Sequence, residues 1–167
     1  CHEVAFNLLF CKKFFMIHLH SFLRYAVLVA ALYTLYKIWT AWRANAAFEK
    51  STQKANLLFL ILCDTQLLIG LYLYFTGPWG IKNIQNMGMA NVMKDAVGRF
   101  FAVEHTIGMI LALVLVHMAY ASSKKNSSDL AKHKKMFWFN CIALIIMLAS
   151  IPWPFRAAIG RAWFPGM

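Results

Sequence analysis

Several ionisable side chains lie inside stretches of sequence that are otherwise strongly apolar. Imidazoles can ligate a metal ion, carboxyl groups can carry a proton or orient a histidine, and a guanidinium can bind an anionic group. Inside a lipid bilayer each such group is costly unless it is paired or hydrated, so each is a candidate for function. The candidates are Arg24, Asp64, Glu104, His105 and His117, with His20 close to the start of its stretch.

His20 and His105 form the leading candidate pair. They lie about three and six residues into two stretches that we expect to run parallel, so a rise of about 1.5 Å per residue puts their depths about 5 Å apart. Two imidazoles that face each other across a helical bundle can supply both axial ligands of a haem iron. His18 competes with His20, but their side chains point about 200° apart around a helix, and we prefer His20 because it lies deeper.

Arg24 and Glu104 allow two interpretations. Arg24 follows His20 by four residues and shares its helix face, so it can reach a haem propionate near the outer surface. Arg24 and Glu104 also lie at nearly the same depth, which allows an ion pair that only fixes the register of two helices. Gly70 and Gly108 leave room for a flat macrocycle or, equally, for close helix packing.

His117 follows His105 by twelve residues, which is about 18 Å along a helix and about 120° around it. His117 is a further candidate ligand. A second haem at its depth would need His133, from a loop, as its other axial ligand. We therefore expect one haem or none.

Asp64 lies near the middle of its apolar stretch, with Gln66 beside it. One interpretation is a proton relay, or a hydrogen-bond acceptor that orients a ligand histidine. The other is a protonated, inward-facing side chain hydrogen-bonded across the bundle. The sequence favours neither.

The composition predicts the elements that position these residues. Of the 167 residues, 61% are apolar and 14% charged, whereas a soluble domain has about 25% charged residues. The composition therefore argues against a soluble enzyme, a disordered tail and a free nucleic-acid-binding domain. Four apolar stretches have a length close to the roughly 20 residues that a membrane-spanning helix needs. We expect an all-α, four-helix transmembrane bundle with spans at about 17–42, 56–75, 99–120 and 136–155.

Charge predicts the orientation of these spans in the membrane. Lys and Arg gather in connections 43–54 and 121–135, whereas connection 77–98 carries only Lys82 and Lys94. Cytoplasmic loops are enriched in Lys and Arg, so both termini should lie on the periplasmic side. Residues 16–167 form one domain, and residues 1–15 are a doubtful leader because Met16 directly precedes the first span.

Other motifs that carry chemistry are absent from the sequence. Cys63 and Cys141 lie inside spans and Cys1 and Cys11 in the leader, without the spacing of a zinc site or of covalent haem attachment. No phosphate loop, nucleophile elbow or metalloprotease motif is present. We assign no catalytic residues, and an electron carrier or redox subunit is favoured over a stand-alone enzyme.

Four segments resemble a group of small four-span membrane proteins of Bacteroidetes-type bacteria that are labelled cytochrome b or cytochrome-b-like. The segments are MIHLHSFLRY (16–25), LLIGLYLYF (67–75), RFFAVEHTIGM (99–109) and IPWPFR (151–156). The resemblance covers about residues 16–167. It implies a haem-bearing or respiratory-chain-associated protein of the bacterial inner membrane.

The leading hypothesis is a membrane electron-transfer protein that holds one b-type haem between the first and third spans. It would exchange electrons with quinone or with other membrane subunits. The second hypothesis is a haem-free structural or assembly subunit of a larger membrane complex, in which Arg24, Glu104 and Asp64 serve helix packing. A small proton-coupled transporter ranks third.

Overall fold

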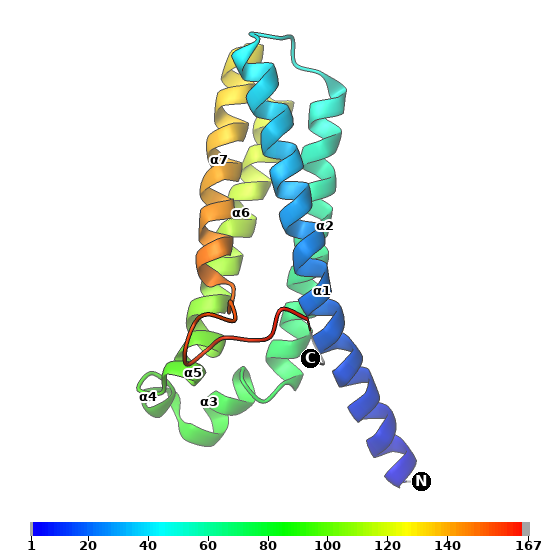
Figure 1. The fold of residues 1–167 in the computed structure, drawn as a ribbon, viewed down its shortest axis with the longest axis vertical. Helices are drawn as coiled ribbons and strands as arrows, with labels where there is room; N and C mark the ends of the chain where they lie inside the picture. Colours follow the sequence, from blue (N-terminus) through cyan, green and yellow to red (C-terminus); the bar gives the residue numbers. More distant parts are fainter. Residues whose placement is uncertain (1, 165–167) are drawn as a thin grey trace. The chain divides into compact units, whose positions relative to one another are not determined.

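The computed structural model describes the backbone of residues 2–164 and the side chains of residues 14–164, and every regular element in this part of the chain is a helix (Figure 1). Cys1 and the side chain of Cys11 lie outside the described residues. The all-α prediction is confirmed. The elements are α1 (His2–Arg43), α2 (Lys50–Thr76), α3 (Ile81–Met87), α4 (Met89–Val92), α5 (Ala96–Arg99), the π-helical turn η1 (Phe100–Glu104), α6 (His105–Lys124) and α7 (Asp129–Ser150).

Three helical stretches among the described residues are long and apolar enough to cross a membrane. They are Phe14–Arg43, Lys50–Met87 and Ala96–Lys124. Large apolar side chains also cover the outside of these helices, including Val29, Leu32 and Leu68. Helices that are apolar all round are typical of membrane spans. The chain therefore has the helices of a membrane protein.

Helix α7 differs from the fourth span expected from the sequence. It begins at Asp129 and carries three lysines in its first two turns, and it ends at Ser150. Its uncharged part, residues 136–150, is shorter than the about 20 residues of a typical span. Pro152 disfavours helical geometry at the residue before it, so residues 151–155 do not continue the helix.

The chain divides into two compact units. The first comprises Cys1–Arg24, Gln66–Thr106 and Ile151–Met167, and the second comprises Tyr25–Thr65 and Ile107–Ser150. In the second unit, residues 25–43 of α1, 50–65 of α2, 107–124 of α6 and all of α7 run alongside one another (Figure 1). Their fully buried side chains include Ile38, Phe59, Val116 and Met136, one from each helix.

Polar contacts join the helices of the second unit. Asn140 Nδ2 on α7 donates a hydrogen bond of 2.6 Å to Asn56 Oδ1 on α2, and both side chains are fully buried. Thr34 Oγ1 on α1 donates to the carbonyl oxygen of Ala55 at 3.1 Å. Side-chain hydrogen bonds of this kind hold helices together in membranes.

The sequence predicts that His133 lies in a loop, but the structure places it in α7. Its ring is fully buried in the second unit, and its Nε2 lies 3.3 Å from the carbonyl oxygen of Ala46. The helix starts early because Ser128 and Asp129 begin it, with Ser128 Oγ accepting from the backbone N–H of Ala131 at 3.4 Å.

In the first unit, the beginning of α1 and the end of α2 are joined by the short helices α3 to α5, by η1 and by the C-terminal segment. Arg24 anchors this segment: its Nη2 donates to the carbonyl oxygens of Trp163 at 2.6 Å and Ala162 at 3.3 Å. The Arg161 guanidinium lies 4.8 Å from the Phe101 ring centre and 5.6 Å from that of Trp79. These contacts hold the C-terminal segment against the other parts of the first unit.

Candidate functional site

The structure brings His20 and His105 together in the first unit. His20 lies on α1 and His105 is the first residue of α6. Their ring centres are 6.3 Å apart, and the ring planes make an angle of 75°. His18 packs instead against Phe14, with ring centres 4.0 Å apart. His20, rather than His18, is therefore the histidine of α1 that lies against His105.

The spacing of the two rings fits one metal ion between them. An imidazole nitrogen binds a metal at about 2 Å, which places the ring centre about 3 Å from the ion and two opposed rings about 6 Å apart. The angle between the planes is no obstacle, because each ring can turn about its own metal–nitrogen bond. Among the described side chains, no cluster of three or more His, Cys, Asp or Glu that could hold a metal is found. The spacing of the pair is compatible with one nitrogen ligand from each ring.

His20 lies against α2 through a glycine. A Cβ atom on Gly70 would lie 3.2 Å from Cε1 and 3.8 Å from Nδ1 of His20. One turn earlier on α2, Gln66 Nε2 donates to the carbonyl oxygen of His20 at 2.9 Å. Gln66 and Gly70 share one helix face because they are four residues apart. Together they bring α2 close to α1 at the level of His20.

The His20 ring has an unused polar atom. Its Nδ1 is buried and has no hydrogen-bond partner among the described residues. Most buried polar atoms in proteins are hydrogen-bonded, and an exception calls for an explanation such as a missing ligand. The buried ring is therefore well placed to use one of its nitrogens for a ligand.

A π-helical turn precedes His105. Residues Phe100–Glu104 form this turn, and the backbone N–H of His105 donates to the carbonyl oxygen of Phe100, five residues earlier. Single π-helical turns inside α-helices are frequent at functional sites. The Phe100 ring centre lies 6.0 Å from that of His105. The turn therefore sets the direction of the His105 side chain at the start of α6.

Glu104 pairs with Arg99, which corrects the expected Arg24–Glu104 ion pair. Arg99 Nε and Glu104 Oε1 are 2.7 Å apart. The π turn places residues five apart on one face, so these two side chains meet directly. The guanidinium of Arg24 is directed to carbonyl oxygens of the C-terminal segment.

His117 and Asp64 form a separate pair in the second unit. His117 Nε2 lies 3.0 Å from Asp64 Oδ1, and the two side chains are 52% and 43% exposed. Asp64 on α2 therefore contacts a histidine of α6, but this histidine is His117 and not one of the leading pair. Both interpretations of Asp64 remain predictions.

The sequence did not reveal the aromatic and cationic contacts beside His105. Arg156 lies over the Phe100 ring, with its Cζ 4.8 Å from the ring centre. Nothing in the pattern of residues 151–156 points to this contact, because a cation over a ring far away in the sequence leaves no periodic signal. The buried Asn56–Asn140 pair was also missed, although each asparagine stands in an apolar run.

No protein-family model, curated protein or solved structure matches this chain. The resemblance to cytochrome-b-like proteins therefore stays a prediction, and the function has to be argued from the geometry of the His20–His105 pair.

Proposed function

We propose that this chain is a cytochrome-b-like membrane electron-transfer protein. It holds one b-type haem between His20 and His105 and exchanges electrons with quinone or with a respiratory partner. The observation that carries the proposal is the 6.3 Å separation of the two ring centres, which is the separation of two axial imidazoles on one metal. A macrocycle supplies the remaining ligands of such an iron.

The neighbouring residues fit this role. Gly70 leaves the edge of His20 uncrowded, and Gln66 fixes the backbone of α1 at that residue. Arg24 follows His20 by one turn and brings a positive charge to this side of the pair, with its Nη2 donating to carbonyl oxygens of the C-terminal segment. When bound, the haem supplies one-electron chemistry, while the axial ligands and the buried surroundings set its reduction potential.

We further propose that the chain crosses a bacterial inner membrane four times, with both termini on the periplasmic side. In support, residues 43–54 carry three Lys or Arg and residues 121–135 carry five, whereas residues 77–98 carry two. The α7 helix would make the fourth crossing together with the apolar residues that follow Ser150.

The ligand assignment is tested by haem content. His20→Ala and His105→Ala should each lose the b-type absorption spectrum, because one axial ligand is removed in each. His18→Ala is the matched control, since His18 is two residues away and packs against Phe14. The measurement is the ratio of haem to protein after purification in detergent, with haem supplied during expression.

Full haem content in both His20→Ala and His105→Ala would overturn the ligand assignment. Equal loss of haem in His18→Ala would also count against it, because a general folding defect would then explain the losses.

One observation favours the second candidate, a subunit of a larger membrane complex. The His117–Asp64 pair is about half exposed on helices of the membrane-crossing stretches, whereas ionisable residues in spans normally face the bundle interior or water. A protein partner that covers this face would remove the conflict.

The double variant Asp64→Leu with His117→Leu tests this candidate. If the pair faces a partner subunit, the variant should leave the complex during extraction in mild detergent. If the pair faces lipid, the variant should show the same association state as the wild type. It should also gain thermal stability, because a polar pair is removed from the lipid-facing surface.

A further inference from the structure

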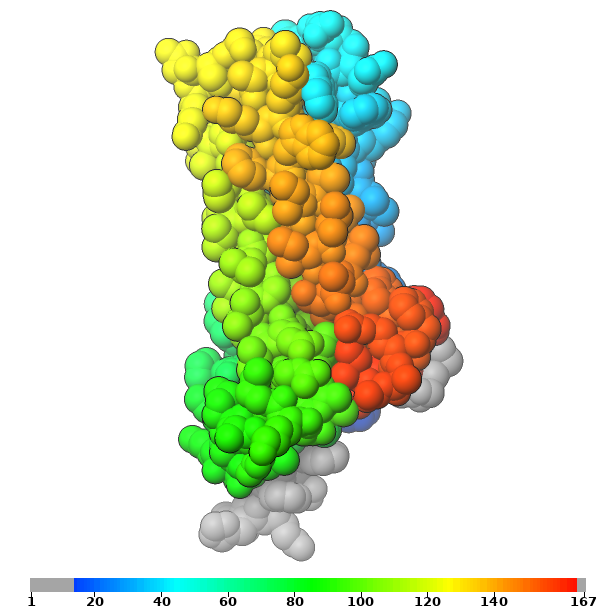
Figure 2. Space-filling view, turned by 90° about the vertical axis from the view of Figure 1, so that its left-hand side faces the viewer, coloured from blue at the N-terminus to red at the C-terminus, as the bar shows by residue number. Residues whose placement is uncertain are grey.

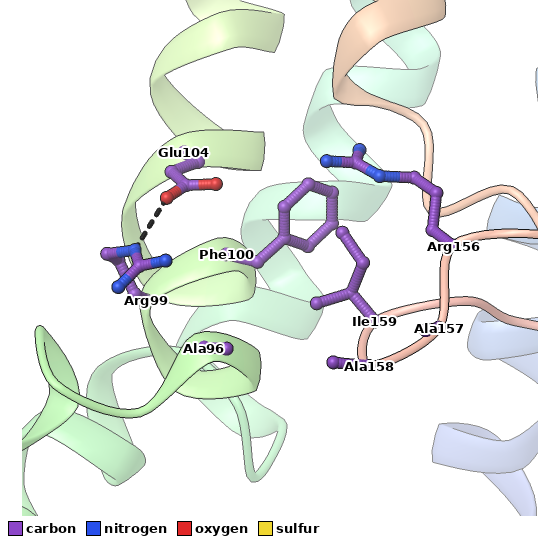
Figure 3. Close-up of a pocket in the computed structure, with 8 residues that line it drawn as sticks. All are labelled: Ala96, Arg99, Phe100, Glu104, Arg156, Ala157, Ala158 and Ile159. Atoms are coloured by element: carbon purple, nitrogen blue, oxygen red, sulfur yellow. Dashed lines mark hydrogen bonds and ion pairs between the residues drawn. The ribbon is translucent and has the colours of Figure 1, made fainter.

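A pocket of about 350 Å³ lies between the π-helical turn and the C-terminal segment of the first unit. Figure 3 shows the Arg99 and Glu104 side chains on one side of it and Arg156 on the other, with the Phe100 ring between them. Ala158 and Ile159 close it from the C-terminal segment. In Figure 2 the two segments, green and red, adjoin on one face of the molecule. Pockets of this volume are large enough for part of a small ligand.

The pocket is electropositive. Two guanidinium groups and one carboxylate line it, and the Glu104 carboxylate is held by Arg99 at 2.7 Å. Arg161 adds a third guanidinium nearby, over the Phe101 ring. Within residues 14–24, 66–106 and 151–164, six Lys or Arg face only two acidic residues, Asp95 and Glu104. The charge of the pocket and its surroundings therefore favours an anionic ligand.

The pocket lies at the start of a helical stretch that is long and apolar enough to cross a membrane. It begins at Ala96, which is also the first residue of the membrane-crossing stretch Ala96–Lys124. Trp79, in contact with Arg161 in the same unit, is of the residue type that gathers at the level of lipid headgroups. Lipid phosphates lie near the ends of a spanning helix, so the arginines of the pocket are close to where phosphates are expected.

We propose that this pocket binds the phosphate group of an anionic phospholipid. Arginine binds phosphate oxygens through two parallel N–H groups, and basic pockets at membrane-spanning helices are known to hold anionic lipid headgroups. Phe100 and Ile159 provide apolar contact for the glycerol and the first acyl carbons. The pocket adjoins the proposed haem site, because the Phe100 ring centre lies 6.0 Å from that of His105, but its ligand does not require haem.

Native mass spectrometry of the full chain released from nanodiscs tests the proposal. Nanodiscs contain either phosphatidylglycerol mixed with phosphatidylcholine or phosphatidylcholine alone. The wild-type chain should retain one phosphatidylglycerol in preference to phosphatidylcholine. A third sample, phosphatidylcholine nanodiscs with added glycerol phosphate, asks whether a soluble anion takes the site instead.

Two variants and a control locate the lipid. Arg156→Gln should weaken retention of phosphatidylglycerol about fivefold or more, the effect of one arginine near an anionic surface. Ala158→Leu should have a similar effect without a change in charge, because Ala158 is exposed and its larger replacement fills the pocket. Arg43→Gln is the control, since Arg43 also lies over an aromatic ring, that of Trp39, but in the second unit.

Equal retention of phosphatidylglycerol in the wild type, Arg156→Gln and Ala158→Leu would overturn the proposal. Glycerol phosphate bound at the site, without any preference for phosphatidylglycerol over phosphatidylcholine, would overturn the lipid as its ligand and identify a soluble anion.

Discussion

His20 and His105 are held in place by different neighbours. The ring of His20 rests on Gly70, and its backbone is fixed by Gln66. His105 is positioned by the π-helical turn before it. If the two histidines are ligands, as proposed, a pair held by packing and backbone contacts needs little rearrangement to bind, which favours tight binding of a rigid group. The geometry of the pair therefore depends on residues that do not themselves act as ligands.

At the same scale, the buried Asn56–Asn140 hydrogen bond should contribute to stability. Asn140→Ala leaves Asn56 buried without its partner, so we expect a loss of about 1–3 kcal/mol in the free energy of unfolding. Replacing both asparagines with leucine should cost less, because no buried amide is then left unpaired. Thermal or denaturant unfolding in detergent measures both.

Thr65→Ala is the control for this prediction. Thr65 is exposed on α2 and its hydroxyl donates only to the carbonyl oxygen of Ile61 in its own helix, so its loss should change stability by less than about 0.5 kcal/mol. A double leucine variant that is less stable than Asn140→Ala would show that the pair itself stabilises the bundle more than apolar packing does.

At the scale of elements, the close approach of α1 and α2 depends on Gly70. A methyl group there would lie 3.2 Å from Cε1 of His20, so the imidazole has to turn or the helices have to separate. We expect Gly70→Ala to weaken haem binding about tenfold, or about 1.4 kcal/mol, and Gly70→Leu to abolish it. Titration of haem into the purified chain measures the affinity.

Leu68→Ala is the matched control, because Leu68 is exposed on the same helix two residues away. Haem affinity that is unchanged in Gly70→Leu would contradict the role of Gly70 and would place any haem away from His20. Far-ultraviolet circular dichroism of each variant checks that the helices are retained.

The helices could be predicted from hydropathy, but their details at the site could not. Long apolar runs indicate α1, α2 and α6 because lipid contact requires them. The π turn at Phe100–Glu104 was not predicted, because one extra residue in a turn changes neither the length nor the hydropathy of a run. For that reason the sequence did not predict the Arg99–Glu104 pair, and it suggested Arg24 in place of Arg99 as the partner of Glu104. The early start of α7 had a signal in Ser128 and Asp129.

At the scale of the whole molecule, composition indicates a membrane protein. The positions of His20 and His105 along two parallel spans predicted that they lie close together. The contacts of the C-terminal segment were beyond reach. Arg24, Arg156 and Arg161 bind carbonyl groups or lie over aromatic rings, and such contacts leave no periodic pattern in a sequence. Pro152 and Pro154 indicate only that the helix stops.

The proposed orientation predicts which connections face the periplasm. In a chain whose four cysteines are replaced by alanine, a cysteine at Asn86 should react with a membrane-impermeant maleimide in intact bacterial cells. A cysteine at Asn126 should react only after lysis, because the connection 121–135, which is rich in lysine, is expected on the cytoplasmic side. Both positions are exposed. The reverse pattern would contradict the orientation and leave the site geometry untouched.

The central claim is that His20 and His105 hold a haem, and one spectrum of the wild-type chain tests it most directly. The chain is expressed with haem supplied, purified in detergent and measured as a dithionite-reduced minus oxidised difference spectrum, with a pyridine haemochrome assay for stoichiometry. We predict a b-type signal with one haem per chain. A helical, well-folded but colourless protein would contradict the claim and favour the haem-free subunit.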